Sequence, residues 1–155
     1  MTIRRVFPIV TLLALAALPA LAKPNFSGNW KLNVSKSSFG QMPAPDSATY
    51  KIAHDDPKLK SSVKQSGQMG EMEFESNYTT DGKESTNEMF GQPIKSTVKW
   101  DGDALVIDST GKFGDNEFSM HAKWTLSEDG KTLTVAQTFK SAMGEGEQKL
   151  VLDKQ

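Results

Sequence analysis

The chain has 155 residues, no cysteine and a formal net charge of −1. This length suits one domain. The slight acidity argues against a nucleic-acid binder, which needs a basic face to release counterions. Without cysteine, the fold depends on its packed core rather than on disulfide bonds.

The N-terminal segment has the pattern of an export signal. Arg4 and Arg5 precede an uncharged apolar stretch that is short for a membrane-spanning helix, and Ala20-Leu21-Ala22 matches a small-residue cleavage site. We therefore predict a signal peptide over residues 1–22, rather than a membrane anchor. The protein is expected to be periplasmic or secreted, and no other segment is apolar enough to span a bilayer as a helix.

The mature chain is expected to form one domain over residues 23–155. Both arginines of the sequence lie in the predicted signal, so the mature chain has none. Arginine is the residue best suited to bidentate capture of carboxylate or phosphate. A ligand of this protein is therefore not expected to be an anion held by a guanidinium group.

Apolar and polar residues alternate along most of the mature chain, which is typical of half-buried strands. Between the first two strands, Pro43 and Pro45 exclude a long helix, and only a helical turn at 35–39 followed by an extended loop is expected. The pattern predicts about ten strands, at residues 28–33, 48–54, 58–65, 71–78, 84–90, 94–100, 104–113, 117–126, 133–139 and 147–153.

Three Asp-Gly pairs, Asp81-Gly82, Asp101-Gly102 and Asp129-Gly130, separate runs of alternating residues. Such pairs favour tight β-hairpins, because they tolerate positive φ angles. Repeated hairpins predict an antiparallel meander, and a long meander hides its edges most simply by closing. The predicted fold is all-β: a single antiparallel up-and-down β-barrel of about 8–10 strands, with no substantial helix, whose first and last strands meet.

The third and fourth strands allow a register to be predicted. If Lys64 faces Glu71, then Val63 faces Met72, so that opposite charges meet outside and apolar side chains meet inside. A slip by one residue would place both sets on the wrong face.

The inward faces of the predicted strands are not uniformly apolar. They include Ser61, Gln65, Ser76, Asn87, Ser96, Ser109 and Gln137. Unpaired polar groups in a solid core are costly, so these residues either lie near the barrel ends or line a wet cavity. Barrels of this size can hold one small ligand. The residues predicted to line the cavity or close its ends are Trp30, Tyr50, Met72, Phe74, Tyr78, Met89, Trp100, Met120, Trp124 and Phe139.

Gly28-Asn29-Trp30, at the start of the first strand, resembles the Gly-x-Trp hallmark of the lipocalins in the calycin superfamily. The resemblance is greatest to small secreted lipocalin-like proteins of bacteria. It implies that Trp30 closes one end of a barrel whose cavity binds small hydrophobic molecules. The chain departs from the lipocalin pattern at the second motif, which Thr80-Asp81-Gly82 matches only in part, and the basic residue that packs on the tryptophan cannot be arginine.

Fatty-acid-binding proteins fit the sequence less well. They have two helices after the first strand, and the proline-bearing loop here is too short for them. Their carboxylate-binding arginine is also absent.

The sequence contains no motif for catalysis or metal binding. His54-Asp55-Asp56 is interpreted as a polar hairpin turn, and His121 as a solvated surface residue. Two distant histidines do not make a metal site without further ligands. No nucleophile motif is present. We therefore predict no catalytic residue, no metal and no cofactor.

The leading functional hypothesis is an exported, non-enzymatic carrier or sensor of a small hydrophobic or weakly polar molecule. A second hypothesis is an envelope protein-interaction module with a filled core, which presents the loop 41–47 and an exposed apolar cluster around Phe39, Met42 and Pro43. A third is a barrel isomerase or cyclase that uses Tyr50 or His54 as a proton relay. The sequence does not identify a protein partner.

Overall fold

The computed structural model describes residues 22–155, and nearly all of the predicted signal peptide lies outside this range. The described chain consists of ten antiparallel strands and one short 3₁₀ turn, η1. The strands are β1 (Gly28–Leu32), β2 (Ser47–Asp55), β3 (Lys58–Gly67), β4 (Gly70–Thr79), β5 (Asp81–Met89), β6 (Gln92–Asp101), β7 (Ala104–Phe113), β8 (Asn116–Leu126), β9 (Thr132–Ser141) and β10 (Gly144–Lys154); η1 is Val34–Lys36.

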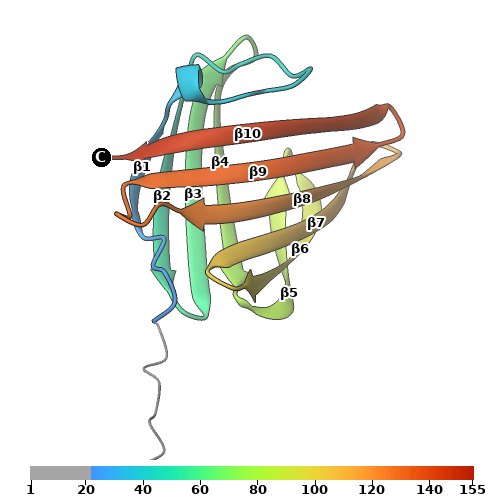
Figure 1. Cartoon of the computed structure of the whole chain (residues 1–155). Helices are drawn as coiled ribbons and strands as arrows, with labels where there is room; N and C mark the ends of the chain where they lie inside the picture. The colour runs from blue at the N-terminus through green and yellow to red at the C-terminus, as the bar shows by residue number, and fades with distance from the viewer. Residues whose placement is uncertain (1–21) are drawn as a thin grey trace, which may run out of the picture.

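The strands form one sheet in the order β4-β3-β2-β1-β10-β9-β8-β7-β6-β5. Apart from the β1–β10 pair, neighbours in the sheet are neighbours in sequence. β1 pairs with both β2 and β10, as Trp30 faces Tyr50 on one side and Lys154 on the other. The sheet curls into a barrel (Figure 1). The predicted up-and-down barrel and the meeting of its first and last strands are therefore confirmed.

The barrel is nearly closed rather than fully hydrogen-bonded. β4 and β5 are the two edges of the sheet and share no ladder of backbone hydrogen bonds. The prediction that Asp81-Gly82 forms a tight hairpin between these strands is wrong. Gly82 does adopt a positive φ of 81°, but it lies in a bulge of β5 against β6.

The register of β3 and β4 differs from the predicted one by two residues. Lys64 faces Glu73, and Val63 faces Phe74. Gly67 pairs with Gly70, so the hairpin closes through a turn of two residues. Gly70 follows this turn with a φ of +87°, which glycine adopts readily. A longer loop was expected there. A shift of two preserves the inside and outside faces, so the charged pairs still lie outside, with Nζ of Lys64 3.3 Å from Oε1 of Glu73.

The segment between β1 and β2 is a single turn of 3₁₀ helix followed by a loop. The Asn33 side chain caps the turn by accepting a hydrogen bond from the Lys36 N–H. The loop then pairs briefly with β10 through Ser38 and Lys149. Phe39 packs against the core, so the prediction that it belongs to an exposed apolar cluster is wrong; Met42 is exposed as expected.

No helix among residues 22–155 has the length and apolar character needed to cross a membrane.

Candidate binding site in the barrel interior

One end of the barrel is closed by aromatic side chains. Phe26, in the segment before β1, and Trp30 have no exposed surface. The Trp30 indole N–H donates a 3.1 Å hydrogen bond to the Phe26 carbonyl. The ammonium group of Lys154 lies 5.3 Å from the centre of the Trp30 ring, a distance suited to a cation–π contact. A lysine near the C-terminus therefore packs on this tryptophan.

His54 also belongs to the closed end, and the prediction that it lies in a polar turn is wrong. It is the last inward residue of β2, and 3% of its side chain is exposed. Its Nδ1 accepts a 3.2 Å hydrogen bond from the Phe26 N–H, which places the proton of the neutral ring on Nε2. That Nε2 has no hydrogen-bond partner and lies 3.5 Å from Oδ1 of Asp56. The ring therefore anchors the N-terminal segment to β2.

Asp56 connects three elements at the same end. Its Oδ1 accepts a 3.0 Å hydrogen bond from the Trp100 indole N–H and another from the Thr80 hydroxyl. The Thr80 hydrogen bond is the main reason that the pKa of Asp56 lies below its usual value. The carboxylate thus joins the β2–β3 turn to the start of β5 and the end of β6. Phe26, Trp30 and His54 form a buried plug at this end of the barrel, and the half-exposed Asp56 lies at its surface.

The other half of the barrel is not packed solid. On β4, the inward residues Met72, Phe74, Ser76 and Tyr78 are half-buried, whereas the outward residues that alternate with them are exposed. Met89 on β5, Met120 on β8 and Phe139 on β9 are also inward and half-buried. These inward side chains are packed less completely than those at the closed end, and we call the barrel interior that they face the lumen.

Tyr50, on β2, belongs to the same inward-facing set of side chains. Tyr50 faces inward opposite Val63 and Trp30. Burial raises the pKa of its phenol to about 12, yet part of its surface is accessible. Burial also raises the pKa of Tyr78, so both phenols are neutral hydrogen-bond donors at physiological pH.

Small polar side chains line one wall of the lumen. Ser85, Ser96 and Ser109 are direct neighbours across β5, β6 and β7. The hydroxyls of Ser96 and Ser109 are 2.7 Å apart and hydrogen-bond each other, which satisfies these groups at a buried position. Ser96 and Ser109 are therefore packed and satisfied, whereas the half-buried Ser85 retains accessible surface on this wall.

Charged side chains are kept to the outside. Lys60, Lys64 and Lys95 form ion pairs with acidic residues on the outer surface of neighbouring strands. The inward positions of the described strands between the two ends carry apolar residues, Ser, Tyr, Asn and Gln. The lumen therefore offers hydrogen bonds but no fixed charge, which suits an uncharged ligand.

The open end is lined by a row of phenylalanines. Ring centres lie 5.4 Å apart for Phe74–Phe90, 5.9 Å for Phe90–Phe113, 4.6 Å for Phe113–Phe118 and 5.4 Å for Phe118–Phe139. Phe90, Phe113 and Phe118 were not among the predicted lining residues. Phe90 and Phe113 stand at strand ends beside glycine, where a pattern of alternation stops. Only the curvature of the sheet brings them to the mouth of the lumen.

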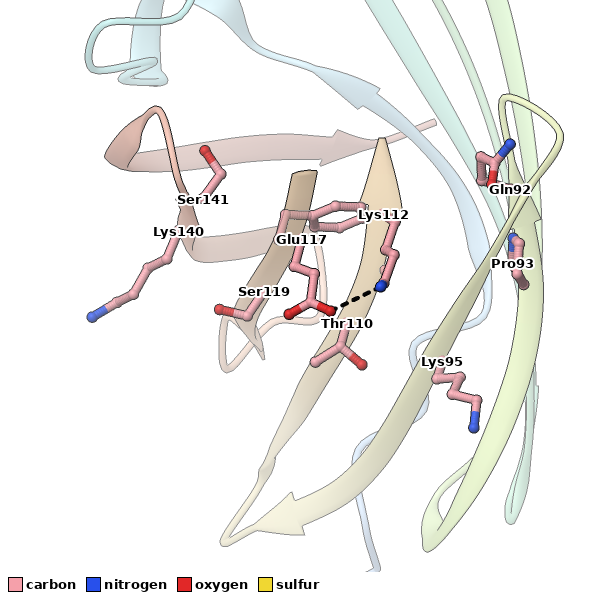
Figure 2. Close-up of a pocket in the computed structure, with 11 residues that line it drawn as sticks. Gln92, Pro93, Lys95, Thr110, Lys112, Glu117, Ser119, Lys140 and Ser141 are labelled. Atoms are coloured by element: carbon pink, nitrogen blue, oxygen red, sulfur yellow. Dashed lines mark ion pairs between the residues drawn. The ribbon is translucent and has the colours of Figure 1, made fainter. Parts of the chain in front are cut away.

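A separate groove of about 640 Å³ lies on β6–β9 near the open end. Most of its lining side chains, such as Thr110, Lys112 and Ser119, point outward, and Nζ of Lys112 lies 3.0 Å from Oε1 of Glu117 across it (Figure 2). The groove also reaches Gly111 and the ring of Phe118, which is buried and belongs to the inner face. Its remaining lining is mostly charged or hydroxyl-bearing, which suits an apolar ligand less well than the apolar side chains on the inner face of β4, β8 and β9.

The ten residues predicted to line the cavity divide into two groups. Five lie in the packed core or against it: Trp30, Tyr50, Tyr78, Trp100 and Trp124. The other five are inward-facing and half-buried: Met72, Phe74, Met89, Met120 and Phe139. Of the polar residues predicted to face inward, Asn87 uses its amide to bridge to β4. Among the described residues, no cluster of three or more His, Asp or Glu side chains is arranged to hold a metal ion.

Comparison with known proteins finds no matching family model and no matching curated protein. Solved structures do match. The zebrafish ileal bile acid-binding protein in complex with cholic acid is 18% identical, with a TM-score of 0.56; the match covers 84% of this chain and 98% of that one. Lipid binding protein 8 of Caenorhabditis elegans is 14% identical, with a TM-score of 0.56, over 84% and 95% of the two chains.

Secretory abundant heat soluble protein 4 of Ramazzottius varieornatus is 18% identical, with a TM-score of 0.53, over 84% of this chain and 94% of that one. At these identities the similarity establishes the fold. The chain thus shares the up-and-down β-barrel fold of these structures, and its connection between β1 and β2 is the turn η1 and a loop rather than a pair of helices.

Proposed function

We propose that the protein is an exported, non-enzymatic carrier or sensor that binds one small hydrophobic, uncharged molecule in the open half of its barrel. The observation that carries this proposal is the set of inward yet accessible apolar side chains on β4, β5, β8 and β9. A ligand that covers them gains roughly 25 cal/mol for each Å² of apolar surface removed from water. The serine hydroxyls and the two tyrosine phenols would fix its orientation.

The chemistry of the lumen indicates the class of ligand. It contains neutral donors and acceptors, and the mature chain has no arginine. Transfer of a carboxylate into such a site without a cationic partner is costly. A long-chain alcohol, ester or sterol therefore fits better than the corresponding free acid. The fold similarity supports a binding role, since two of the three proteins compared above are described as binding bile acid or lipid.

The export part of the proposal rests on the N-terminal pattern alone. Expression of the full chain in a Gram-negative host, followed by intact-mass measurement of the envelope fraction, should give a product that begins at Lys23. A product in the cytoplasm that retains residues 1–22 would contradict it.

Binding is tested with Nile red, a neutral fluorescent probe, and with oleyl alcohol and oleate as competitors at neutral pH. We expect saturable binding with one site, and displacement by the alcohol at lower concentration than by oleate. A failure to saturate, or a stronger effect of oleate, would contradict the proposal.

Substitutions at two adjacent residues of β8 distinguish binding in the lumen from binding in the outer groove. Met120 faces inward, whereas Ser119 is exposed on the outer surface and lines the groove. The substitution Met120→Trp should fill the lumen and reduce probe affinity at least tenfold. The matched control Ser119→Trp should leave affinity unchanged. Loss of binding in Ser119→Trp alone would place the site in the outer groove.

A further inference from the structure

The exposed large hydrophobic residues of the described chain gather at one end of the barrel. In an up-and-down barrel, the β1–β2, β3–β4, β5–β6, β7–β8 and β9–β10 connections share one end (Figure 1). Each of these five connections carries such a residue there: Met42, Met69, Phe90, Phe113 and Met143. The most exposed are Met143 at 87% and Met69 at 78%. We call these five residues the rim.

The opposite end is different. The turns there consist of Asp55-Asp56-Pro57, Thr80, Gly102-Asp103 and residues 127–131. Within residues 22–155, none of these turns holds an exposed large hydrophobic side chain. Isolated exposed apolar residues are normal on protein surfaces, but their concentration at one end indicates an interaction surface.

The backbone at Phe90 points to the same conclusion. Phe90 has a φ of +52° and is the one non-glycine residue in the described part of the chain with a positive φ. Asn or Gly is the usual residue at that position of a two-residue hairpin turn, and a bulky side chain is disfavoured there. The chain nevertheless places a phenylalanine with 59% of its surface exposed at this tip. Such local strain is typical of functional positions.

The rim is continuous with the lumen. The Phe90 ring packs against Phe74 inside the mouth and against Phe113 on the next hairpin. Phe113 in turn stacks on Phe118, which is buried. An apolar path therefore leads from the hairpin tips to the candidate binding site.

The charges near the rim do not favour an anionic surface, because Glu71, Glu88 and Asp115 beside the tips add negative charge to the paired side chains. Lys112 pairs with Glu117 at 3.0 Å, Lys140 with Glu145 at 3.0 Å, and Lys64 with Glu73 at 3.3 Å. Paired lysines offer little attraction to an anionic surface. The occupant of this face is therefore selected by apolar contact rather than by charge.

We propose that the rim inserts into the surface of an uncharged, zwitterionic lipid bilayer. The rim side chains stand on five separate hairpin or loop tips, an arrangement that suits penetration of a fluid surface better than packing against a flat protein face. Insertion would place the mouth of the lumen against the acyl chains, so that an apolar molecule enters without crossing water. Only this last step, transfer of ligand, rests on the proposed function.

The test is flotation of the mature, ligand-free protein with vesicles of pure phosphatidylcholine. The rim variant Met69→Ser/Phe90→Asn/Met143→Ser removes three apolar tips, and Asn suits the turn at position 90. We expect wild type to float with the vesicles, at an extent unchanged by 0.5 M NaCl. The rim variant should show at least a tenfold lower partition coefficient and a retained melting temperature. The control Asp103→Ser/Glu128→Ser, at the opposite end, should behave as wild type.

Several results would overturn the proposal: no flotation of wild type, flotation that requires anionic lipid, or equal flotation of wild type and the rim variant. A dimer in sedimentation equilibrium that the rim variant abolishes, without flotation, would assign the rim to a second copy of the chain. Met120→Trp separates this proposal from the proposed function, because it should lose Nile red binding and still float.

Discussion

The Asn87 side chain reproduces a backbone pairing across the gap in the sheet. Its Oδ1 accepts a 2.7 Å hydrogen bond from the Asn77 N–H, and its Nδ2 donates a 3.1 Å hydrogen bond to the Asn77 carbonyl. These are the two hydrogen bonds that a residue of a neighbouring strand would make. One amide side chain thus joins β4 to β5, where the ladder is absent.

Replacement of this amide should loosen the gap. In Asn87→Ala both hydrogen bonds are lost, at a cost of about 1 kcal/mol each or less, because the site is partly exposed. Hydrogen exchange at the Asn77 amide should accelerate, while exchange in the β7–β8 hairpin stays unchanged. Asn87→Asp keeps the acceptor but loses the donor, so its effect on exchange should be intermediate. Unchanged exchange at Asn77 in the alanine variant would show that the bridge does not hold the strands together.

Gly111 is required by the packing of the open end. A Cβ at this position would lie 2.4 Å from Cδ1 of Ile94 and 2.9 Å from the Phe118 ring. Gly111→Ala should therefore destabilise the fold by about 1–3 kcal/mol through overpacking, as measured by urea unfolding. Gly146 is the matched control, since it also lies in a strand but a Cβ there meets nothing within 4 Å. Equal effects of alanine at the two positions would contradict the close packing around Gly111.

The buried phenol of Tyr50 predicts a loss of stability at high pH. Its pKa is about 12 in the folded protein, against 10.0 ordinarily. Between these values the unfolded chain releases the proton and the folded chain retains it, so the free energy of unfolding falls as pH rises from 10 to 12. The full shift corresponds to at most about 2.7 kcal/mol. Urea unfolding of wild type and Tyr50→Phe should diverge in this window, and parallel curves would contradict the burial of the phenol.

His54 should be important for stability rather than for proton transfer. His54→Ala leaves the Phe26 N–H without its acceptor and opens a cavity among aromatic rings, which together should cost about 2–4 kcal/mol. His121 provides the control, because it is exposed and pairs with Asp108 on the outer surface; His121→Ala should change stability by less than about 0.5 kcal/mol. Retained stability in His54→Ala would show that the plug does not depend on this ring.

The carboxylate of Asp56 predicts a loss of stability at low pH. Its pKa is lowered, first of all by the Thr80 hydroxyl, so its contribution is present above the ordinary pKa of the unfolded chain. The contribution is lost as pH falls through the folded value. Asp56→Asn keeps an acceptor for Thr80 and Trp100 but has no charge to titrate. The acid limb of its stability curve should therefore be flatter than that of wild type, and identical limbs would contradict this assignment.

Alternation was sufficient to place the strands, because a residue that faces the core of a sheet recurs at every second position. It also assigned Met72, Phe74, Met120 and Phe139 to the inner face. It did not determine how far each hairpin extends, so the β3–β4 register was predicted two residues from its observed position. Both registers bury the same face, and only the geometry of the turn at Gly70 distinguishes them.

The alternating pattern did not predict contacts that depend on the curl of the sheet or on its unpaired edge strands. Phe90 and Phe113 belong to separate hairpins and meet only because the sheet curls. His54 stands beside two aspartates in the sequence, and its burial depends on Phe26 folding over the barrel end from outside the strands. Asn87 has the position of an inward residue in the alternating pattern. Because β4 and β5 share no ladder, the backbone groups of Asn77 are left free to pair with the Asn87 amide.

The sequence alone determined that this chain is a meander of about ten strands with charges outside and neutral side chains inside, because that information is local and repeats at every second residue. The tertiary structure decided that the inward side chains at one end of the interior are fully buried, whereas many of those toward the other end are only half-buried. That division depends on how side chains from strands distant in sequence fill the space between them, and the volume they leave is a property of the closed barrel rather than of any one strand.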